Sequence, residues 1–137
     1  MNISRIVFPE PRKAILESAE EDLAPRGDRV LVKYDYSAVS AGTEIANYHA
    51  NTSYVSFPFF PGYSASGRVV AIGPDVRQLK AGDRVMVLWC GHRSHCLTRE
   101  ANLVRIDDAS VSQQDAALGN IASFAFLGVR KLRIQLG

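Results

Sequence analysis

The sequence predicts a mainly β domain with a few helices, and three observations support this prediction. Short runs in which apolar and polar residues alternate recur along the first two thirds of the chain, as expected of half-buried strands. Turns rich in Gly and Asp separate these runs, which is typical of barrels and sandwiches. A long helical pattern begins only after residue 112. We therefore expect a β structure followed by a C-terminal helical segment.

The N-terminal third is expected to hold three strands. Residues 3–8 and 13–17 flank Pro9 and Pro11, which indicate a turn between two short strands. The clearest strand covers residues 30–38, where apolar residues alternate with polar ones. Its second face is mostly polar, so we expect that face to meet solvent.

The segment from residue 40 to residue 66 has little regular period. It predicts a helical turn around residues 43–49 and then a long loop. Loops of that length in compact domains are usually functional or disordered. Because the loop carries several aromatic residues that can pack, we favour a functional loop; these are Tyr54, Phe57, Phe59 and Phe60.

The rest of the chain predicts short strands and then helix. Four further strands are expected, at residues 67–73, 84–89, 94–98 and 103–106. Residues 112–115, Ser-Gln-Gln-Asp, form a capping pattern in which polar side chains satisfy free backbone N–H groups. A helix should follow over residues 116–132, in two pieces that are broken near Gly119.

Composition excludes several classes of protein. The chain has 137 residues, 47% hydrophobic and 22% charged, with a formal net charge of +2, which suits one globular domain. Lys and Arg do not cluster in the sequence, so a nucleic-acid-binding face is not expected. The longest apolar stretches fall short of the ~20 residues that span a membrane. With no secretory pattern at the N-terminus and only two cysteines, the chain is expected in the cytoplasm.

Residues 66–85 contain the pattern G-x-V-x-x-x-G, a spacer and G-D-R-V. This string resembles the signature of medium-chain dehydrogenases/reductases, the family of zinc-type alcohol dehydrogenases and quinone reductases. Further matches occur in the family's order, before this string at residues 40–44 and 61–62 and after it at residues 100–104 and 115–119. The resemblance implies that residues 1–137 form a GroES-like, partly open β-barrel. It also implies a nucleotide-binding Rossmann domain after residue 137, since the final residues resemble an interrupted domain.

The resemblance places the family's three catalytic zinc ligands at Ala41, Tyr63 and Asn120. Alanine has no donor atom, and Tyr and Asn are poor zinc ligands beside thiolate and imidazole. A catalytic zinc is therefore not expected.

A second cluster, Cys90, His92, His95 and Cys96, is the one tempting metal site in the sequence. Its spacing fits no standard zinc pattern, and on a strand His95 would point away from the other three side chains. Ordinary strand residues are the preferred interpretation.

Two residues carry the expected chemistry. By resemblance, Thr43 falls where many family members keep a hydroxyl that relays a proton from substrate to solvent; the alternative is a Thr that caps the following turn. Tyr63 replaces a histidine ligand, and its phenol would donate a proton to a developing oxyanion. The alternative is a packing tyrosine with its hydroxyl at the surface. Glu44 is expected to pair with Arg68 or Arg93.

The resemblance also places three residues near the cofactor: Gly42, whose backbone would approach its phosphates, and Asn120 and Ser123, near the nicotinamide ring. For Ser123 a buried helix position is an equal alternative. The cofactor of the complete protein would be NAD or NADP. No glycine loop of the G-x-G-x-x-G type is present, so the isolated chain should bind either cofactor poorly and transfer no hydride.

Two functions follow from these residues. The first is the substrate-binding and catalytic domain of a zinc-independent, NAD(P)-dependent oxidoreductase, inactive as an isolated fragment. Its substrate would be a small carbonyl compound, an alcohol or an enone-type molecule with an activated double bond. The second is a stand-alone GroES-like binding or assembly module without redox activity. Apolar surface left bare would favour self-association in either case, so a homo-oligomer is a further option.

Overall fold

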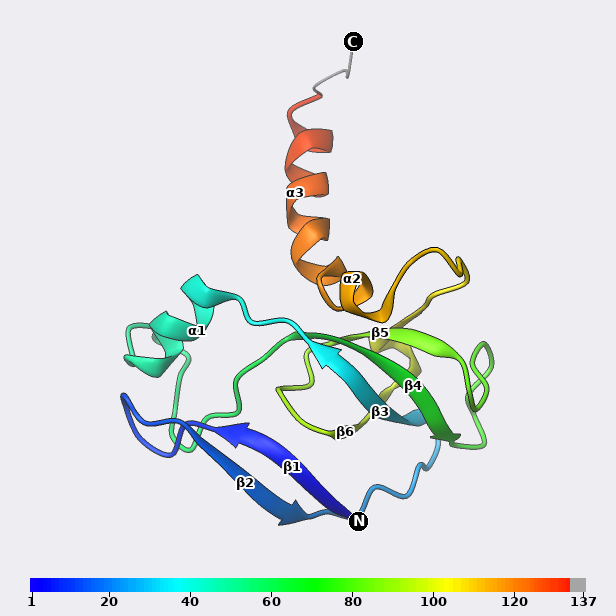
Figure 1. Cartoon of the computed structure of the whole chain (residues 1–137), viewed down its shortest axis with the longest axis horizontal. Coiled ribbons are helices and arrows are strands. Elements are labelled where there is room, and N and C mark those ends of the chain that lie inside the picture. Colours follow the sequence, from blue (N-terminus) through cyan, green and yellow to red (C-terminus); the bar gives the residue numbers. More distant parts are fainter. Residues whose placement is uncertain (134–137) are drawn as a thin grey trace.

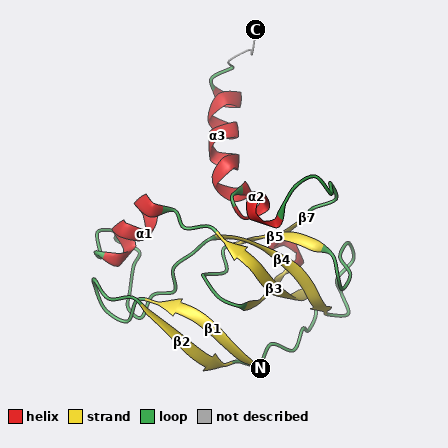
Figure 2. Cartoon of the chain, viewed as in Figure 1, coloured by secondary structure: helices red, strands yellow, loops and turns green. Residues whose placement is uncertain are grey.

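The computed structural model describes residues 1–133, and strands dominate it (Figure 2). The predicted mainly β class with a few helices is confirmed. In chain order the elements are β1 (Asn2–Val7), β2 (Ile15–Glu20), β3 (Arg29–Ser37), α1 (Ala41–Tyr48), β4 (Ser64–Ile72), β5 (Arg84–Leu88), β6 (His95–Arg99), a short 3-10 helix (Glu100–Asn102), β7 (Leu103–Arg105), α2 (Gln113–Ala117) and α3 (Gly119–Lys131).

The strands form two antiparallel sheets. The larger sheet has the order β6-β3-β4-β5-β7, and β1 and β2 form a separate hairpin. The β3–β4 register shifts at two places along the pair, and such bulges increase strand twist and curvature. The larger sheet is therefore curved and open, as predicted. The hairpin lies at the bottom of Figure 1 and joins the rest through isolated bridges from Arg5 to Arg93 and from Phe8 to Phe59.

Strand β3 contributes to two apolar clusters. Val30 and Val32 are fully buried in the main core together with residues of β4, β5 and β6. Leu31 belongs to a second cluster with Ile3 and Leu23. The prediction that the second face of this strand meets solvent is wrong at Leu31, because the N-terminal segments cover it there.

The glycines of the family pattern have different physical roles. At Gly67 an added Cβ would meet the backbone of Lys33 in the neighbouring strand, so only glycine fits this close approach. At Gly73 a Cβ would meet the carbonyl oxygen of Gly27. The φ of Gly73 is not positive, so glycine is required here by the close approach and not by a turn. Gly82 does adopt a φ of +92°, as predicted for a turn.

The predicted helical turn in the first half of the chain and the predicted C-terminal helical segment are both present. α1 covers the expected helical turn. The Ser112 side chain accepts a hydrogen bond from the backbone N–H of Asp115 (3.0 Å), which confirms the cap, and Leu118 interrupts the helix between α2 and α3. Among residues 1–133, no helix is both long and apolar enough to cross a membrane.

Helix α3 stands away from the sheets (Figure 1). Its large apolar side chains are exposed, with 53% exposure at Phe124, 70% at Phe126 and 49% at Leu127. The final stretch 134–137, on which the interpretation of an interrupted domain partly rested, lies outside the described residues.

Candidate functional site

Thr43 and Tyr63 line the same cleft, which has a volume of about 630 Å³. They come from different parts of the chain: Thr43 lies in the first turn of α1, and Tyr63 directly precedes β4. The remaining wall mixes polar and apolar residues, and its aromatic members are Tyr54, Phe59, Phe60 and Trp89. The fold therefore brings together the two residues for which the sequence predicts proton transfer.

The position of Tyr63 is fixed by its backbone and by its ring. Its carbonyl oxygen accepts hydrogen bonds from the backbone N–H of Trp89 (3.0 Å) and from the Nδ2 atom of Asn120 (3.1 Å). Its ring stacks on that of Trp89, with centroids 5.6 Å apart and planes inclined by 27°. The side chain is half-buried, so the phenol is held at a defined place on the cleft wall.

Gly62 allows the chain to reach this position. It has a φ of +104°, which an L side chain rarely adopts. An added Cβ would lie 2.7 Å from the backbone nitrogen of His92. That nitrogen instead donates a hydrogen bond to the carbonyl oxygen of Pro61 (2.7 Å). The Tyr63 segment and the loop that carries His92 can therefore run side by side only with glycine at residue 62.

A buried polar network joins α1 to the same loop. The Nε2 atom of His92 lies 2.8 Å from Oε1 of Glu44, and its Nδ1 atom lies 2.9 Å from the Ser37 hydroxyl. Each of the two partners in the first contact is only 8% exposed. The expectation that Glu44 pairs with Arg68 or Arg93 is wrong.

Both arginines have other partners. Arg68 lies 3.8 Å from Asp35, and Arg93 lies 3.1 Å from Glu21. Because each arginine pairs with another acid, Glu44 pairs with His92 instead, and both of these side chains are buried.

The position of Thr43 argues against a capping role. The residue at the N-cap of α1 is Ser40, whose side chain makes no capping hydrogen bond. Ser40 Oγ instead lies 3.4 Å from Thr43 Oγ1, at the long end for a hydrogen bond. Thr43 is half-buried and is one of the residues that line the cleft.

The three residues expected near a cofactor lie at the ends of two helices. Asn120 is buried in the first turn of α3, where its side-chain amide holds the Tyr63 carbonyl. Ser123 is exposed, and its hydroxyl donates to the Asn120 carbonyl oxygen (2.7 Å), so the alternative of a buried helix position is wrong. Gly42 is exposed at the start of α1, with open space beside its Cα atom.

The Cys-His cluster does not converge on a common point. His92 faces Glu44, while the His95 ring nitrogen Nδ1 lies 3.1 Å from the Ser94 hydroxyl. Cys90 lies in a loop instead of the expected strand and packs against the main core, in which Cys96 is buried. Within the described part of the chain, no three His, Cys, Asp or Glu side chains gather as a metal site would require.

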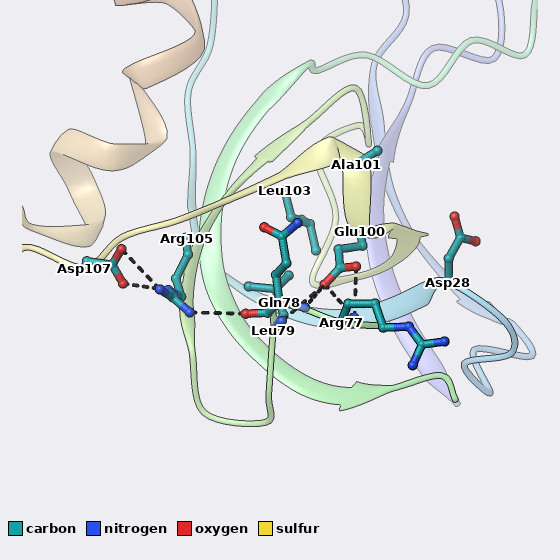
Figure 3. A pocket seen from close by; sticks show the side chains of 9 residues that line it. All are labelled: Asp28, Arg77, Gln78, Leu79, Glu100, Ala101, Leu103, Arg105 and Asp107. Atoms are coloured by element: carbon teal, nitrogen blue, oxygen red, sulfur yellow. Dashed lines mark hydrogen bonds and ion pairs between the residues drawn. The ribbon is translucent and has the colours of Figure 1, made fainter. Parts of the chain in front are cut away.

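A larger cavity, of about 810 Å³, contains none of the predicted residues (Figure 3). Two of its charged side chains, Glu100 and Arg105, already have partners within the cavity wall. The Glu100 carboxylate accepts hydrogen bonds from three consecutive backbone N–H groups, those of residues 77–79. Arg105 donates to Asp107 (2.6 Å). We therefore assign this cavity a structural role in holding the loop between β4 and β5.

Sequence analysis missed two residues of the cleft wall. Trp89 was interpreted only as the end of a strand, yet it stacks on Tyr63 and adopts a φ of +62°, which turns the chain out of β5. Cys90 was interpreted as an ordinary strand residue, yet it lines the cleft. A bulky aromatic residue just past a strand and followed by Cys-Gly is the signal that could have indicated a turn here.

Comparison with known families covers most of the chain. Residues 26–131 match the model of the alcohol dehydrogenase GroES-like domain. The uncharacterized zinc-type alcohol dehydrogenase-like protein YdjJ of Escherichia coli strain K12 is 30% identical over 116 residues, which cover 75% of this chain and 31% of that protein. The quinone oxidoreductase-like protein 2 of Mus musculus is 40% identical over 84 residues, which cover 58% of this chain and 24% of that protein.

A solved structure shows the same fold. The quinone oxidoreductase from Coxiella burnetii superposes with a TM-score of 0.84 at 18% identity, covering 100% of this chain and 47% of that chain. This chain spans less than a third of the length of the two curated relatives, at 31% and 24%. On the family match, this chain belongs to the medium-chain dehydrogenases/reductases, of which it forms the N-terminal, alcohol dehydrogenase GroES-like domain.

Proposed function

We propose that this chain is the substrate-binding and catalytic domain of a cytoplasmic, zinc-independent, NAD(P)-dependent oxidoreductase. The substrate is a small carbonyl compound, alcohol or enone-type molecule. The observation that carries the proposal is that Thr43 and Tyr63 line one cleft, together with several aromatic side chains. Names of relatives support the reaction class, since they include alcohol dehydrogenases and quinone oxidoreductases.

The donor atoms at the ligand positions do not fit a catalytic zinc. Ala41 offers no donor atom, and the Asn120 amide is a poor zinc ligand beside thiolate and imidazole. The Tyr63 phenol is a weak ligand at neutral pH compared with thiolate or imidazole. We therefore route no step through a metal.

In this proposal Tyr63 does the work of a proton donor. When bound in the complete protein, the nicotinamide supplies or takes up the hydride. As charge develops on the substrate oxygen, the Tyr63 hydroxyl donates a hydrogen bond and then its proton. The stacked Trp89 ring keeps the phenol in place, which reduces the reorganisation that this transfer requires.

Thr43 completes the proton path. Its hydroxyl can accept and donate at once, so it can pass a proton between the Tyr63 phenolate and solvent at the cleft mouth. The neighbouring Ser40 hydroxyl provides a further step outward, at 3.4 Å from Thr43 Oγ1. For alcohol oxidation the same path runs in reverse.

The exposed apolar side chains of α3 support the proposal that a second domain packs against this helix. Helix α3 contacts the site through the hydrogen bond from Asn120 to the Tyr63 carbonyl oxygen. Phe124 and Phe126, further along this helix, are more than half exposed. Burying such side chains contributes about 1.5–3 kcal/mol each. We propose that a nucleotide-binding domain covers α3 in the complete protein, and that NAD(P) binds with one side toward Gly42, Asn120 and Ser123.

An antibody against this chain tests the proposal in its source cells. A native band far above the 15.0 kDa of the chain, together with quinone- or carbonyl-dependent oxidation of NAD(P)H by the captured protein, is the expected result. A native band at 15.0 kDa with no such activity would favour the stand-alone binding module instead.

A further inference from the structure

Helix α1 carries two buried polar residues, Glu44 and Asn47. Glu44 faces His92, but Asn47, which is 5% exposed, lines the cleft together with Thr43. Residues four positions apart lie on the same face of a helix and are separated by about 6 Å along its axis. One wall of the cleft therefore carries a polar group at Thr43 and a second one, a turn further along α1, at Asn47.

Both oxygen atoms of Asn47 already accept hydrogen bonds within the chain. The side-chain oxygen Oδ1 accepts from the hydroxyls of Thr52 (3.1 Å) and Tyr54 (2.9 Å). The backbone oxygen accepts from the N–H group of Ala50 (3.1 Å). These bonds hold the loop after α1 against the end of the helix, and the two hydroxyl groups fix the orientation of the side-chain amide.

The amide nitrogen of the same side chain is not used in this way. Asn47 Nδ2 makes no hydrogen bond to any residue in the described range 1–133. Within that range, the fully buried side-chain polar atoms that lack a partner are the Tyr34 hydroxyl and Gln113 Oε1. Asn47 Nδ2 is not among them, so water or a ligand can reach it. An amide nitrogen only donates hydrogen bonds, and Asn47 thus offers a spare donor at the cleft.

Holding the loop explains only half of the Asn47 side chain. A carboxylate would serve Thr52 and Tyr54 equally well, because both hydroxyls need nothing but an acceptor oxygen. The nitrogen becomes important when a ligand fills the cleft and displaces water from it. A ligand that is apolar at this point leaves Nδ2 without a partner, whereas a ligand with an acceptor oxygen there replaces the lost water.

We propose that Asn47 is a specificity-determining residue, which donates a hydrogen bond from Nδ2 to a second oxygen of the substrate. The inference rests on the proposed function, which places the reacting oxygen beside Tyr63 and Thr43. The separation of Thr43 and Asn47 along α1 suits a six-membered ring with an oxygen at each end. Compounds with two such acceptor oxygens are therefore preferred over compounds of the same ring with one.

The test compares 1,4-cyclohexanedione with cyclohexanone, which share a ring and differ in the second oxygen. NMR titration of the chain follows the side-chain NH2 group of Asn47 and the indole N–H of Trp89, the only tryptophan, which lines the same cleft. We expect the dione to bind about five- to twentyfold more tightly. About twofold comes from its two equivalent carbonyl groups, and the rest from the added hydrogen bond. The Asn47 NH2 resonances should move more with the dione than with cyclohexanone.

Two variants separate recognition of the ligand from support of the loop. Asn47→Asp keeps an acceptor for Thr52 and Tyr54 but removes the donor, so the preference for the dione should fall to about twofold or less. The matched control is Tyr54→Phe, which removes one loop hydrogen bond, leaves Nδ2 in place and should retain the preference. If Asn47→Asp does not fold, the wild-type titration decides the question by itself.

Binding of the dione no more than twofold tighter than that of cyclohexanone by the wild-type chain would overturn the proposal. An unchanged preference in a folded Asn47→Asp variant would also overturn it. Turnover by the complete protein is a separate measurement. A dione that binds more tightly to the chain, but that the complete protein does not reduce with NAD(P)H, would support the role of Asn47 and contradict the proposed oxidoreductase function.

Discussion

His92 and Glu44 form a buried contact of 2.8 Å that joins helix α1 to the loop behind the cleft. The residue before Glu44 is Thr43, and the residues just before His92 include Trp89 and Cys90, which line the cleft. One polar contact between residues 48 positions apart therefore sets the two walls of the site relative to each other.

Removing this contact should destabilise the fold. In Glu44→Ala the buried His92 Nε2 atom loses its partner, which costs about 1–3 kcal/mol. Chemical unfolding of the two proteins measures the difference. The matched control is Glu10→Ala, which removes an exposed pair with Lys13 and should change the free energy of unfolding by less than about 0.5 kcal/mol. Equal effects in the two variants would show that the buried contact contributes nothing special.

The backbone at Gly62 should be the least tolerant of the glycines near the site. Gly62→Ala introduces strain at a φ of +104° and a Cβ 2.7 Å from the His92 nitrogen, so we expect a loss of more than about 2 kcal/mol. Gly82→Ala introduces backbone strain at a positive φ but no steric clash, because no atom lies within 4 Å of the added Cβ. We expect this variant to lose about 1–2 kcal/mol of stability. Gly128→Ala, in the exposed α3 helix, should stabilise by about 0.5–1 kcal/mol. Thermal unfolding of the three variants gives the order, and a Gly62 variant as stable as the Gly82 variant would contradict the close packing at His92.

Two substitutions of Thr43 distinguish a hydroxyl that relays protons from a side chain that only packs. In the complete protein, Thr43→Val keeps the shape of the side chain but removes the hydroxyl, and kcat should fall at least tenfold because the proton path is broken. Thr43→Ser keeps the hydroxyl and should retain most of the activity. Steady-state kinetics with a solvent isotope effect measure both; equal loss in the two variants would indicate packing in place of relay.

The sequence predicted those parts of the fold that depend on local pattern. Alternation marked β3, the capping pattern marked the start of α2, and Gly82 marked a turn, because each depends on neighbours within a few residues. The Glu44–His92 contact could not be predicted, since it depends on how α1 returns to a loop far along the chain. Leu31 was missed for the same reason: its cover comes from the N-terminal segments, not from its own strand.

Of the site, the resemblance supplied Thr43, Tyr63 and Asn120, and the structure brings the last two into contact. That Cys90 lines the cleft could be seen only in the folded chain. In sequence it belongs to a crowded Cys-His string, and only the fold separates its thiol and that of Cys96 from the two histidines.

Asp28 should respond to acid in a defined direction. The hydrogen bond from Arg99 (2.7 Å) lowers the pKa of Asp28 below its usual value. Its contribution to stability is therefore present above the unfolded-state pKa of about 3.9 and is lost as pH falls through the lower folded-state pKa. Carboxyl NMR titration should show that Arg99→Gln raises the pKa of Asp28. An unchanged value would mean that the ion pair does not persist in solution.

The bare surface of α3 should drive self-association of the isolated chain. Phe126 and Leu132 are 70% and 72% exposed. Sedimentation velocity should show concentration-dependent oligomers, and Phe126→Ser together with Leu132→Ser should shift them to monomer. As a control, Leu16→Ser removes an equally exposed apolar side chain on β2, at 72%, and should leave the association unchanged. A chain that stays monomeric at high concentration would argue that α3 needs no partner.

The most direct test of the central claim is kcat for NAD(P)H oxidation by the complete protein in excess chelator, compared between wild type and Tyr63→Phe. The account predicts that chelator leaves the wild-type kcat unchanged and that Tyr63→Phe lowers it by about 10²-fold or more, because the proton donor is lost. Activity that disappears in chelator and returns with added Zn²⁺, with Tyr63→Phe equal to wild type, would contradict it.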